Sequence, residues 1–285
     1  MKIALFLNKD IESNITYNLL KKELLNHEVK IYYSGAVGNP KKKPFELLRL
    51  ERFEKEFFFN GLIDFIQENR IETDFEFLDQ NFKSFTIEEC ANVNSTEFIA
   101  NMNEFCPDLF ISIRFGKIFK DDVIKVPGRG LINLHSAILP DYRGIMGTLH
   151  AIKERNNKIG CTLHTIPNGG IDTGEIIEIA KCNADYERSL FWNIIQLYPL
   201  GANLIIKALK NLEQNINVKT IKQNPEEGRY FSVPNQSDFD QIKNLGMNVI
   251  SEKDYQQVIT DFVLKDLSEK EKRHLTLCLS NSGLS

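Results

Sequence analysis

Three polar residues near the middle of the chain have side chains that can work together in acyl transfer. Asn133 and His135 are two positions apart in the stretch LINLH, so on a strand they point to the same face. Asp172 follows in the glycine-rich stretch GGIDTG. An amide can stabilise an oxyanion, an imidazole can move a proton near neutral pH, and a carboxylate can orient that imidazole. Each residue alone is typical of a turn or a structural histidine, but the set favours catalysis. The other histidines of this region, His150 and His164, are interpreted as structural.

The segments around these residues predict how they are positioned. Gly130–Leu134 is a short apolar strand, and Ser136–Gly144 must be a loop because proline, aspartate and glycine interrupt it. Pro167–Gly174 is a second turn-rich loop. Functional groups of parallel sheets collect on loops at the carboxyl ends of the strands. We therefore expect the asparagine, the histidine and the aspartate to converge on one reacting centre.

The segments before this region predict an α/β fold with a parallel sheet. Lys2–Leu7 and His27–Tyr33 have the character of strands, and Ser13–Asn26 between them has apolar residues at helical spacing. Strand–helix–strand units cross over with a right hand and produce parallel strands. Asp108–Phe115 is a continuous apolar strand, typical of one that is buried on both faces.

Further predicted helices, and a break in the pattern after about Asn224, indicate the domain organisation. Helices are expected over Phe45–Arg70, Ser95–Phe105, Gly144–Arg155 and Glu187–Leu212, and strands over Gly160–Ile166 and Glu175–Ile179. After about Asn224 glycine and proline break the pattern, two shorter helices follow, and Cys278–Ser285 is expected to be frayed. We therefore expect an α/β catalytic body over residues 1–212 and a small C-terminal appendage over residues 213–285.

Composition and charge exclude several classes of protein. Of the 285 residues, 42% are hydrophobic and 26% charged, which is ordinary for a soluble domain. The net charge of −4 argues against a dedicated nucleic-acid surface. The apolar run Ile3–Leu7 is too short for a signal sequence or a membrane span, so we expect a cytoplasmic protein. The five cysteines are scattered, so neither a disulfide framework nor a metal site is expected.

Two separated motifs carry a resemblance to a known family. The first is N-x-H-x-x-x-L-P-x-x-R-G, which starts at Asn133, and the second combines G-x-T-L-H with the later G-G-I-D-T-G. Their order and gap are similar to those of the folate-dependent formyltransferases, which include glycinamide ribonucleotide, methionyl-tRNA and sugar-nucleotide formyltransferases. The clear resemblance runs from about Asp108 to Ile177. It implies a Rossmann-like sheet with helices on both faces.

The resemblance also implies roles for individual residues. It makes Asn133, His135 and Asp172 the catalytic set and 10-formyltetrahydrofolate the formyl donor, with no metal required. It further implies that the strand end after Asp108 and the second loop line the pterin pocket. The residues concerned are Ile113, Phe115, Gly116, Lys117, Pro167, Asn168, Gly169 and Gly170. Because relatives are often dimers, a homodimer is a further expectation.

The sequence outside the catalytic set reduces the number of possible acceptor substrates. The first strand runs into LNKDIES rather than a glycine-rich phosphate loop, which counts against a purine ribonucleotide. The roughly seventy residues after Leu212 and the negative net charge count against tRNA. The chain most resembles sugar-nucleotide N-formyltransferases, which modify nucleotide-linked amino-deoxy sugars of bacterial surface polysaccharides. The segment GTLH at 147–150 departs from the proline and tryptophan that are common there, which leaves an unusual acceptor open.

Other interpretations stay open. A formyltetrahydrofolate hydrolase uses the same three residues, although such enzymes usually carry an extra N-terminal domain and this chain starts directly at its first strand. A non-catalytic folate- or nucleotide-binding module would not need to keep all three. A dehydrogenase would need G-x-G-x-x-G after Leu7, and that motif is absent. The run Lys41–Lys43 is either a solvated surface or a contact for an anion.

Overall fold

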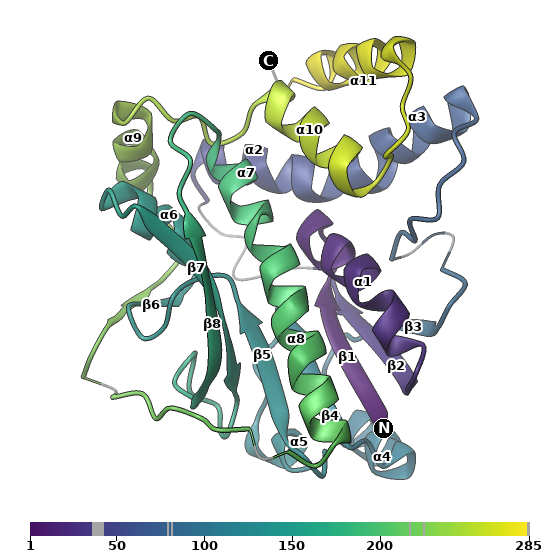
Figure 1. Cartoon of the computed structure of the whole chain (residues 1–285), viewed down its shortest axis with the longest axis vertical. Helices are drawn as coiled ribbons and strands as arrows, with labels where there is room; N and C mark the ends of the chain where they lie inside the picture. Colours follow the sequence, from purple (N-terminus) through teal and green to yellow (C-terminus); the bar gives the residue numbers. More distant parts are fainter. Residues whose placement is uncertain (36–42, 79, 81, 217, 225, 284–285) are drawn as a thin grey trace.

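The computed structural model describes residues 1–35, 43–78, 80, 82–216, 218–224 and 226–283. Figure 1 shows a central sheet with helices on both faces and a further group of helices at the top of the view. The strands are β1 (Lys2–Asn8), β2 (Glu28–Ser34), β3 (Thr86–Glu89), β4 (Leu109–Ile113), β5 (Leu131–His135), β6 (Tyr142–Gly144), β7 (Lys158–Thr165), β8 (Ile176–Asn183) and β9 (Arg229–Phe231). The helices are α1 (Ile11–Leu24), α2 (Phe45–Glu51), the π-helical η1 (Arg52–Gly61), α3 (Leu62–Asn69), α4 (Thr96–Phe105), α5 (Asp121–Ile124), α6 (Gly147–Lys153), α7 (Leu190–Ile195), α8 (Leu197–Glu213), α9 (Gln236–Asn244), α10 (Glu252–Phe262) and α11 (Glu269–Asn281).

The main sheet has the strand order β3-β2-β1-β4-β5-β7-β8. The strands from β3 to β5 are parallel, and β7 and β8 then run antiparallel to their neighbours. The predicted α/β fold is thereby confirmed, and β1, α1 and β2 form its strand–helix–strand opening. The carboxyl ends of β1, β4 and β5 meet at one edge of the sheet, which is where ligand sites form in such folds.

Alternate residues of the central strands pack against two separate layers of helices. The odd-numbered residues between Ile3 and Leu7 belong to a cluster that includes apolar residues of α1 and α8. The even-numbered Ala4 and Phe6 pack on the opposite face with residues of α4 and α5. All of these strand residues are fully buried. The continuous apolar runs seen in the sequence are therefore those of strands covered on both faces.

The helices at the C-terminal end share the core of the body. The helix expected over Phe45–Arg70 is present as α2, η1 and α3 in direct succession. The rings of Phe53 and Phe57 lie 5.8 and 5.6 Å from that of Tyr255 in α10, and the Tyr255 hydroxyl donates to the Phe53 carbonyl at 2.9 Å. The same cluster extends to Leu275 of α11. The division of the chain at residue 212 stays a prediction.

Three helix boundaries differ from the prediction. The segment Glu187–Leu212 contains two helices, α7 and α8, which meet at Gln196. Pro199 has no N–H to donate to the carbonyl four residues earlier, so the hydrogen-bond ladder is interrupted there. The helix expected from Gly144 begins only at Gly147, because Gly144 belongs to β6.

The third difference is at the C-terminus. Residues 278–281, expected to be frayed, form the end of α11. Ser268 begins this helix through a capping box with Glu271, which satisfies backbone N–H groups of the first turn. Leu275 and Leu279 are fully buried. Burial of these two side chains stabilises α11, which is short and highly charged and would be marginal in isolation.

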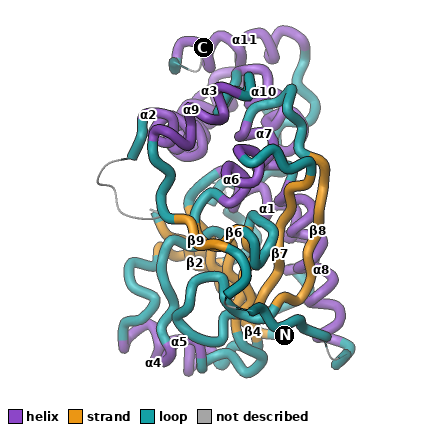
Figure 2. The backbone as a smooth tube through the Cα atoms, turned by 90° about the vertical axis from the view of Figure 1, so that its left-hand side faces the viewer, coloured by secondary structure: helices purple, strands orange, loops and turns teal. Residues whose placement is uncertain are grey.

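A small second sheet joins segments that are far apart in the sequence. β6 follows the predicted catalytic strand, and β9 pairs with it in parallel. Figure 2 shows β9 directly beside β6. No helix within the described ranges is long and apolar enough to cross a membrane. Lys41 and Lys42 lie outside the described residues, and Lys43 forms an ion pair with Glu51 at 2.5 Å.

Candidate active site

The structure brings Asn133, His135 and Asp172 together. Asn133 and His135 lie at the carboxyl end of β5, and Asp172 lies in the loop between β7 and β8. His135 Nδ1 is 3.6 Å from Asp172 Oδ2. The convergence expected from the sequence is therefore present, although not through two loops at one edge. Antiparallel β7 ends beside Ile132 at the start of β5, and the loop that follows it brings Asp172 back to His135.

His164 is a fourth member of the cluster, although its sequence context suggested a structural histidine. It lies on β7 directly opposite Asn133 in the antiparallel register. Asn133 Nδ2 is 3.0 Å from His164 Nε2, and Asp172 Oδ1 is 3.4 Å from the same nitrogen. The other ring nitrogen, Nδ1, donates to the Thr165 carbonyl at 2.8 Å. Nε2 thus faces both the amide donor of Asn133 and the carboxylate of Asp172, and it accepts or donates according to whether it carries a hydrogen.

The ring of His135 is held between two oxygen atoms. Its Nε2 lies 2.7 Å from the Tyr142 carbonyl and donates to it, and its Nδ1 faces Asp172. A ring whose two nitrogens both face acceptors is best satisfied when both carry a hydrogen. Tyr142 is itself fixed, because its hydroxyl donates to Glu154 at 2.7 Å. The arrangement suits a histidine that presents positive charge to a reacting group.

Asp172 is held by partners on several sides. Its backbone has φ of 54°, a left-handed conformation that aspartate tolerates better than most residues. The Gly144 N–H donates to Asp172 Oδ2 at 2.8 Å. Burial alone would raise the pKa of the Asp172 carboxyl, but His135, His164 and the Gly144 N–H hold that pKa well below its usual range. Asp172 is therefore a carboxylate throughout the physiological pH range.

A cavity of about 460 Å³ opens beside the cluster. Asn133, His135 and Asp172 line it. So do most of the residues expected to hold a pterin, namely Phe115, Gly116, Lys117, Asn168, Gly169 and Gly170. The remaining two do not, since Ile113 is fully buried in the core and Pro167 is not among the residues that line the cavity. Apolar side chains with a few polar groups are suited to a planar heteroaromatic ring.

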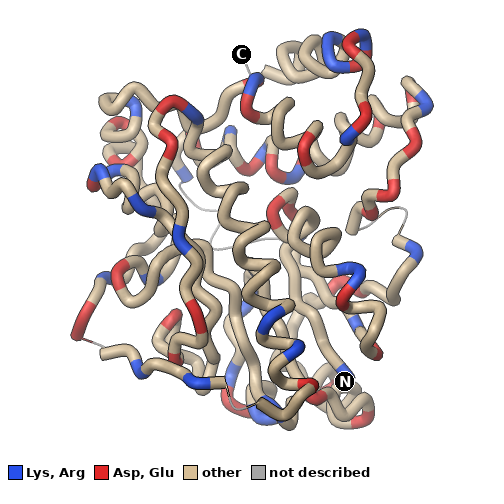
Figure 3. The backbone as a smooth tube through the Cα atoms, viewed as in Figure 1, with Lys and Arg blue, Asp and Glu red and all other residues tan. Residues whose placement is uncertain are grey.

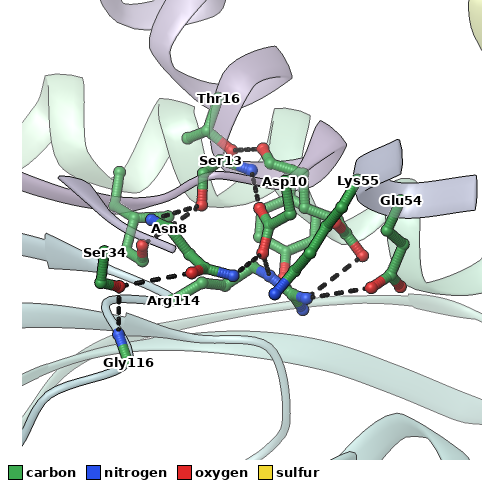
Figure 4. A network of polar contacts seen from close by, with 12 residues as sticks. Asn8, Asp10, Ser13, Thr16, Ser34, Glu54, Lys55, Arg114 and Gly116 are labelled. Carbon is green, nitrogen blue, oxygen red and sulfur yellow. Dashed lines mark hydrogen bonds and ion pairs between the residues drawn. The ribbon is translucent and has the colours of Figure 1, made fainter. Parts of the chain in front are cut away.

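A chain of buried hydrogen bonds supports the loop after β4, as Figure 4 shows. The Gly116 N–H donates to the Ser34 hydroxyl at 2.9 Å, and that hydroxyl donates to Asn8 at 3.3 Å. Asn8 Nδ2 donates to Asp10 at 2.6 Å, and Arg114 donates to the same Asp10 oxygen at 2.7 Å. The first residues of the loop that lines the cavity are thus anchored to the ends of β1 and β2.

No group of histidine, cysteine or acidic side chains able to hold a metal ion occurs among the residues that the structure describes. His150, the other histidine of the motif region, is buried and stacks on Phe231 with the ring centroids 3.9 Å apart. Burial lowers its pKa to about 4, with Lys153 acting in the same direction. This histidine is therefore a neutral part of the core, in line with its interpretation from the sequence.

Comparison with known families agrees with this geometry. Residues 71–191 match the family described as Formyl transferase, and this range contains all four polar residues of the cluster. Less than half of the chain is thus similar to the formyl transferase family. A curated relative, the methionyl-tRNA formyltransferase of Caldicellulosiruptor saccharolyticus, is 28% identical over 134 residues, which are 47% of this chain and 42% of the relative. The chain spans less than half the length of the curated relatives that it matches.

Solved structures share the fold over a longer range. A sugar N-formyltransferase from a Shewanella species superposes with a TM-score of 0.53 at 17% identity, covering 98% of this chain and 87% of the other. The N-formyltransferase from Helicobacter canadensis, in complex with folinic acid and dTDP-3-aminofucose, gives a TM-score of 0.54 at 19% identity, covering 89% and 82%. At these identities the likeness establishes the fold of the chain and not its substrate.

Proposed function

We propose that this protein is an N-formyltransferase that moves a formyl group from 10-formyltetrahydrofolate to the amine of a nucleotide-linked amino-deoxy sugar. The observation that carries the proposal is the cluster of Asn133, His135 and Asp172 at the mouth of a cavity, inside the range that matches the formyl transferase family. Donation of the formyl group is the chemistry that the folate supplies when bound. The remaining steps belong to side chains of this chain.

Each side chain of the cluster has a role in this mechanism. The Asn133 amide has two N–H groups and gives one to His164, so the other can donate to the formyl oxygen as that oxygen gains charge. His135 adds positive charge on the same side. One such donor contributes roughly 3–4 kcal/mol to the transition state. Asp172 orients His135 and lets the proton of the attacking amine pass towards the folate nitrogen that leaves.

The nature of the acceptor is supported by fold and charge. The structures that superpose over most of the chain include sugar N-formyltransferases, and the Helicobacter canadensis structure contains an amino-sugar nucleotide. Lys and Arg are spread over many elements and are interleaved with Asp and Glu across the described chain (Figure 3). The overall charge of −4 is unfavourable for tRNA. The curated relatives nevertheless act on methionyl-tRNA, so that acceptor is the second candidate.

A turnover assay tests the proposal. The protein is incubated with 10-formyltetrahydrofolate and, separately, dTDP-, GDP- and UDP-linked amino sugars or methionyl-tRNA, and tetrahydrofolate release and product mass are followed. We expect a mass gain of one formyl group on an amino-sugar nucleotide. Formylated methionyl-tRNA would instead identify the second candidate. Release of tetrahydrofolate without a formylated product would point to a hydrolase and contradict the proposal.

A further inference from the structure

The cavity has a second polar wall, formed by Arg114 and Glu54. Both residues line the cavity, Arg114 from the loop after β4 and Glu54 from η1. Arg114 Nε lies 2.7 Å from Asp10 Oδ2, and its Nη2 lies 3.5 Å from Glu54 Oε2 and 3.6 Å from Glu12 Oε1. Figure 4 shows Asp10 and Glu54 on either side of the Arg114 guanidinium.

The charges of this wall do not balance. The Arg114 guanidinium faces three carboxyl groups, and Lys55 adds a second positive charge near Glu54. Asp10, Glu12 and Glu54 are each at least 96% buried. Apart from the Glu54 carboxyl, the carboxylate oxygens of Glu12 have no hydrogen-bond partner in the described part of the chain. Burial raises the pKa of both Glu12 and Glu54, against the opposing effect of Arg114, so the two carboxyls tend to share a proton. A buried carboxyl pair in this condition is satisfied by a group that brings positive charge and N–H donors.

This wall adjoins the catalytic cluster. Ile113 of β4 pairs with Leu134 of β5, so the residues that follow them, Arg114 and His135, leave neighbouring strands at the same edge of the sheet. Both residues line the same cavity. Arg114 also donates to the hydroxyl of Tyr198 on α8 at 3.3 Å. Glu54 therefore lines the same cavity in which the acceptor amine would approach the cluster.

The same wall disfavours phosphate. The N-terminus of a helix commonly binds anions, but here Asp10 caps α1 and accepts from the Ser13 N–H at 2.9 Å. Glu12 adds a second carboxyl in the first turn. A phosphoryl group placed there would meet like charges in a buried setting, which costs several kcal/mol in an interface. Lys43 and the exposed Lys117 also line the cavity, and an anion would be tolerated beside them.

We propose that Glu54 selects the acceptor by binding its amino group in the ammonium form and takes one proton from it, which leaves the neutral amine that attacks the formyl carbon, while any phosphoryl group of the acceptor lies away from the end of β1. The inference rests on the proposed function, which requires an amine in this cavity. It deepens that function in two ways. Glu54 becomes the residue that binds the acceptor, and the acceptor is predicted to be a cationic amino sugar.

Calorimetric titration of the full chain tests this without any turnover. The probes are D-glucosamine, its uncharged analogue N-acetyl-D-glucosamine, and inorganic phosphate. We expect the wild-type protein to bind glucosamine but neither of the other two. Glu54→Gln should weaken glucosamine binding at least about tenfold, because it removes one charged partner of a buried pair. Glu56→Gln is the matched control, since Glu56 is on the same helical segment but is exposed and outside the cavity lining.

Several results would overturn the inference. Equal binding of glucosamine and N-acetylglucosamine by the wild-type protein, or no binding of glucosamine, would do so even if Glu54→Gln failed to fold. Glucosamine binding that is unchanged in a folded Glu54→Gln variant, or displaced by phosphate, would also contradict it. These outcomes are separate from a failure of the proposed function, because an absence of formyl transfer in the turnover assay leaves the binding comparison intact.

Discussion

Asp172 is the residue on which the geometry of the candidate active site depends most. Its carboxylate faces His135 with one oxygen and His164 with the other, and the Gly144 N–H donates to it. A neutral amide at this position could not balance the charge of His135 and would present an N–H to one of these donors. Loss of this one charge should therefore disturb the whole cluster.

The variant Asp172→Asn should lower kcat for formyl transfer by roughly 10²–10⁴-fold, the range for loss of acid–base assistance. The KM for 10-formyltetrahydrofolate should stay within about twofold, because the cavity-lining residues outside the cluster are unchanged and a catalytic loss need not alter ground-state binding. Stopped assays of tetrahydrofolate release would measure both constants. Asp141→Asn, the same change at an exposed loop residue, is the control. Near-normal turnover of Asp172→Asn would refute the assigned role.

His164 shows which site residues cannot be predicted from residue types alone. Asn133, His135 and Asp172 could be predicted because their side chains have a recognisable chemistry at a strand end and in a glycine-rich loop. His164 reaches Asn133 only through the antiparallel register of β5 and β7. Nothing in the local sequence states that β7 turns back beside β5, so a histidine within a strand was interpreted as structural.

At the scale of elements, the pairing of β6 with β9 positions Gly144, whose N–H donates to Asp172 in the candidate active site. The Ile145 N–H donates to the Phe231 carbonyl at 2.9 Å, which fixes the chain just after Gly144. Gly144 has φ of 93°, and a Cβ atom built on it would lie 2.1 Å from that same carbonyl oxygen. Only glycine therefore allows β9 to approach while the Gly144 N–H points at Asp172.

The variant Gly144→Ala tests this dependence. Gly130→Ala is its matched control, because Gly130 also has positive φ, at 85°, but a Cβ added there would meet no other atom within 4 Å. Both should lose about 1–2 kcal/mol of stability from the strained backbone. Gly144→Ala should lose more and should also lower kcat, since β9 must move away. Urea denaturation and turnover assays would compare them, and equal effects of the two variants would argue against the role of β9.

The elements themselves were predictable to different degrees. Strands such as Lys2–Leu7 and Asp108–Phe115 are long apolar runs, and burial on both faces follows directly from their composition. The short pairs β6 and β9 have three residues each and no periodicity to detect. The break between α7 and α8 could have been anticipated from Pro199. In contrast, α11 could not be predicted from the sequence, because its stability depends on the tertiary packing of Leu275 and Leu279.

At the scale of the whole molecule, burial of histidines connects stability to pH. His150 is only 3% exposed, and its pKa is lowered to about 4, below the value of roughly 6.5 for an unfolded histidine. As the pH falls below 6.5 the unfolded chain binds a proton that the folded protein does not accept until about pH 4. Folding stability is therefore lost across this window. The lowered pKa of His27, caused first by burial, acts in the same direction.

The variant His150→Phe should remove one part of this loss. It keeps an aromatic ring against Phe231 but has no group to protonate. Between pH 7.5 and pH 5 the wild-type protein should lose roughly 2 kcal/mol more free energy of unfolding than the variant. Urea denaturation at the two pH values would measure the difference. Parallel pH dependence in both proteins would mean that His150 accepts its proton in the folded state.

The strand β9 also limits how this protein can be recombined. The sequence suggests a boundary near residue 212, and an exchange of everything beyond it would seem natural for giving the catalytic body a new acceptor specificity. Such a chimera would discard Arg229–Phe231, the segment that lies against the loop supporting Asp172. An exchange that preserves the candidate active site must therefore keep this strand and Val233, which also lines the cavity, or supply equivalents.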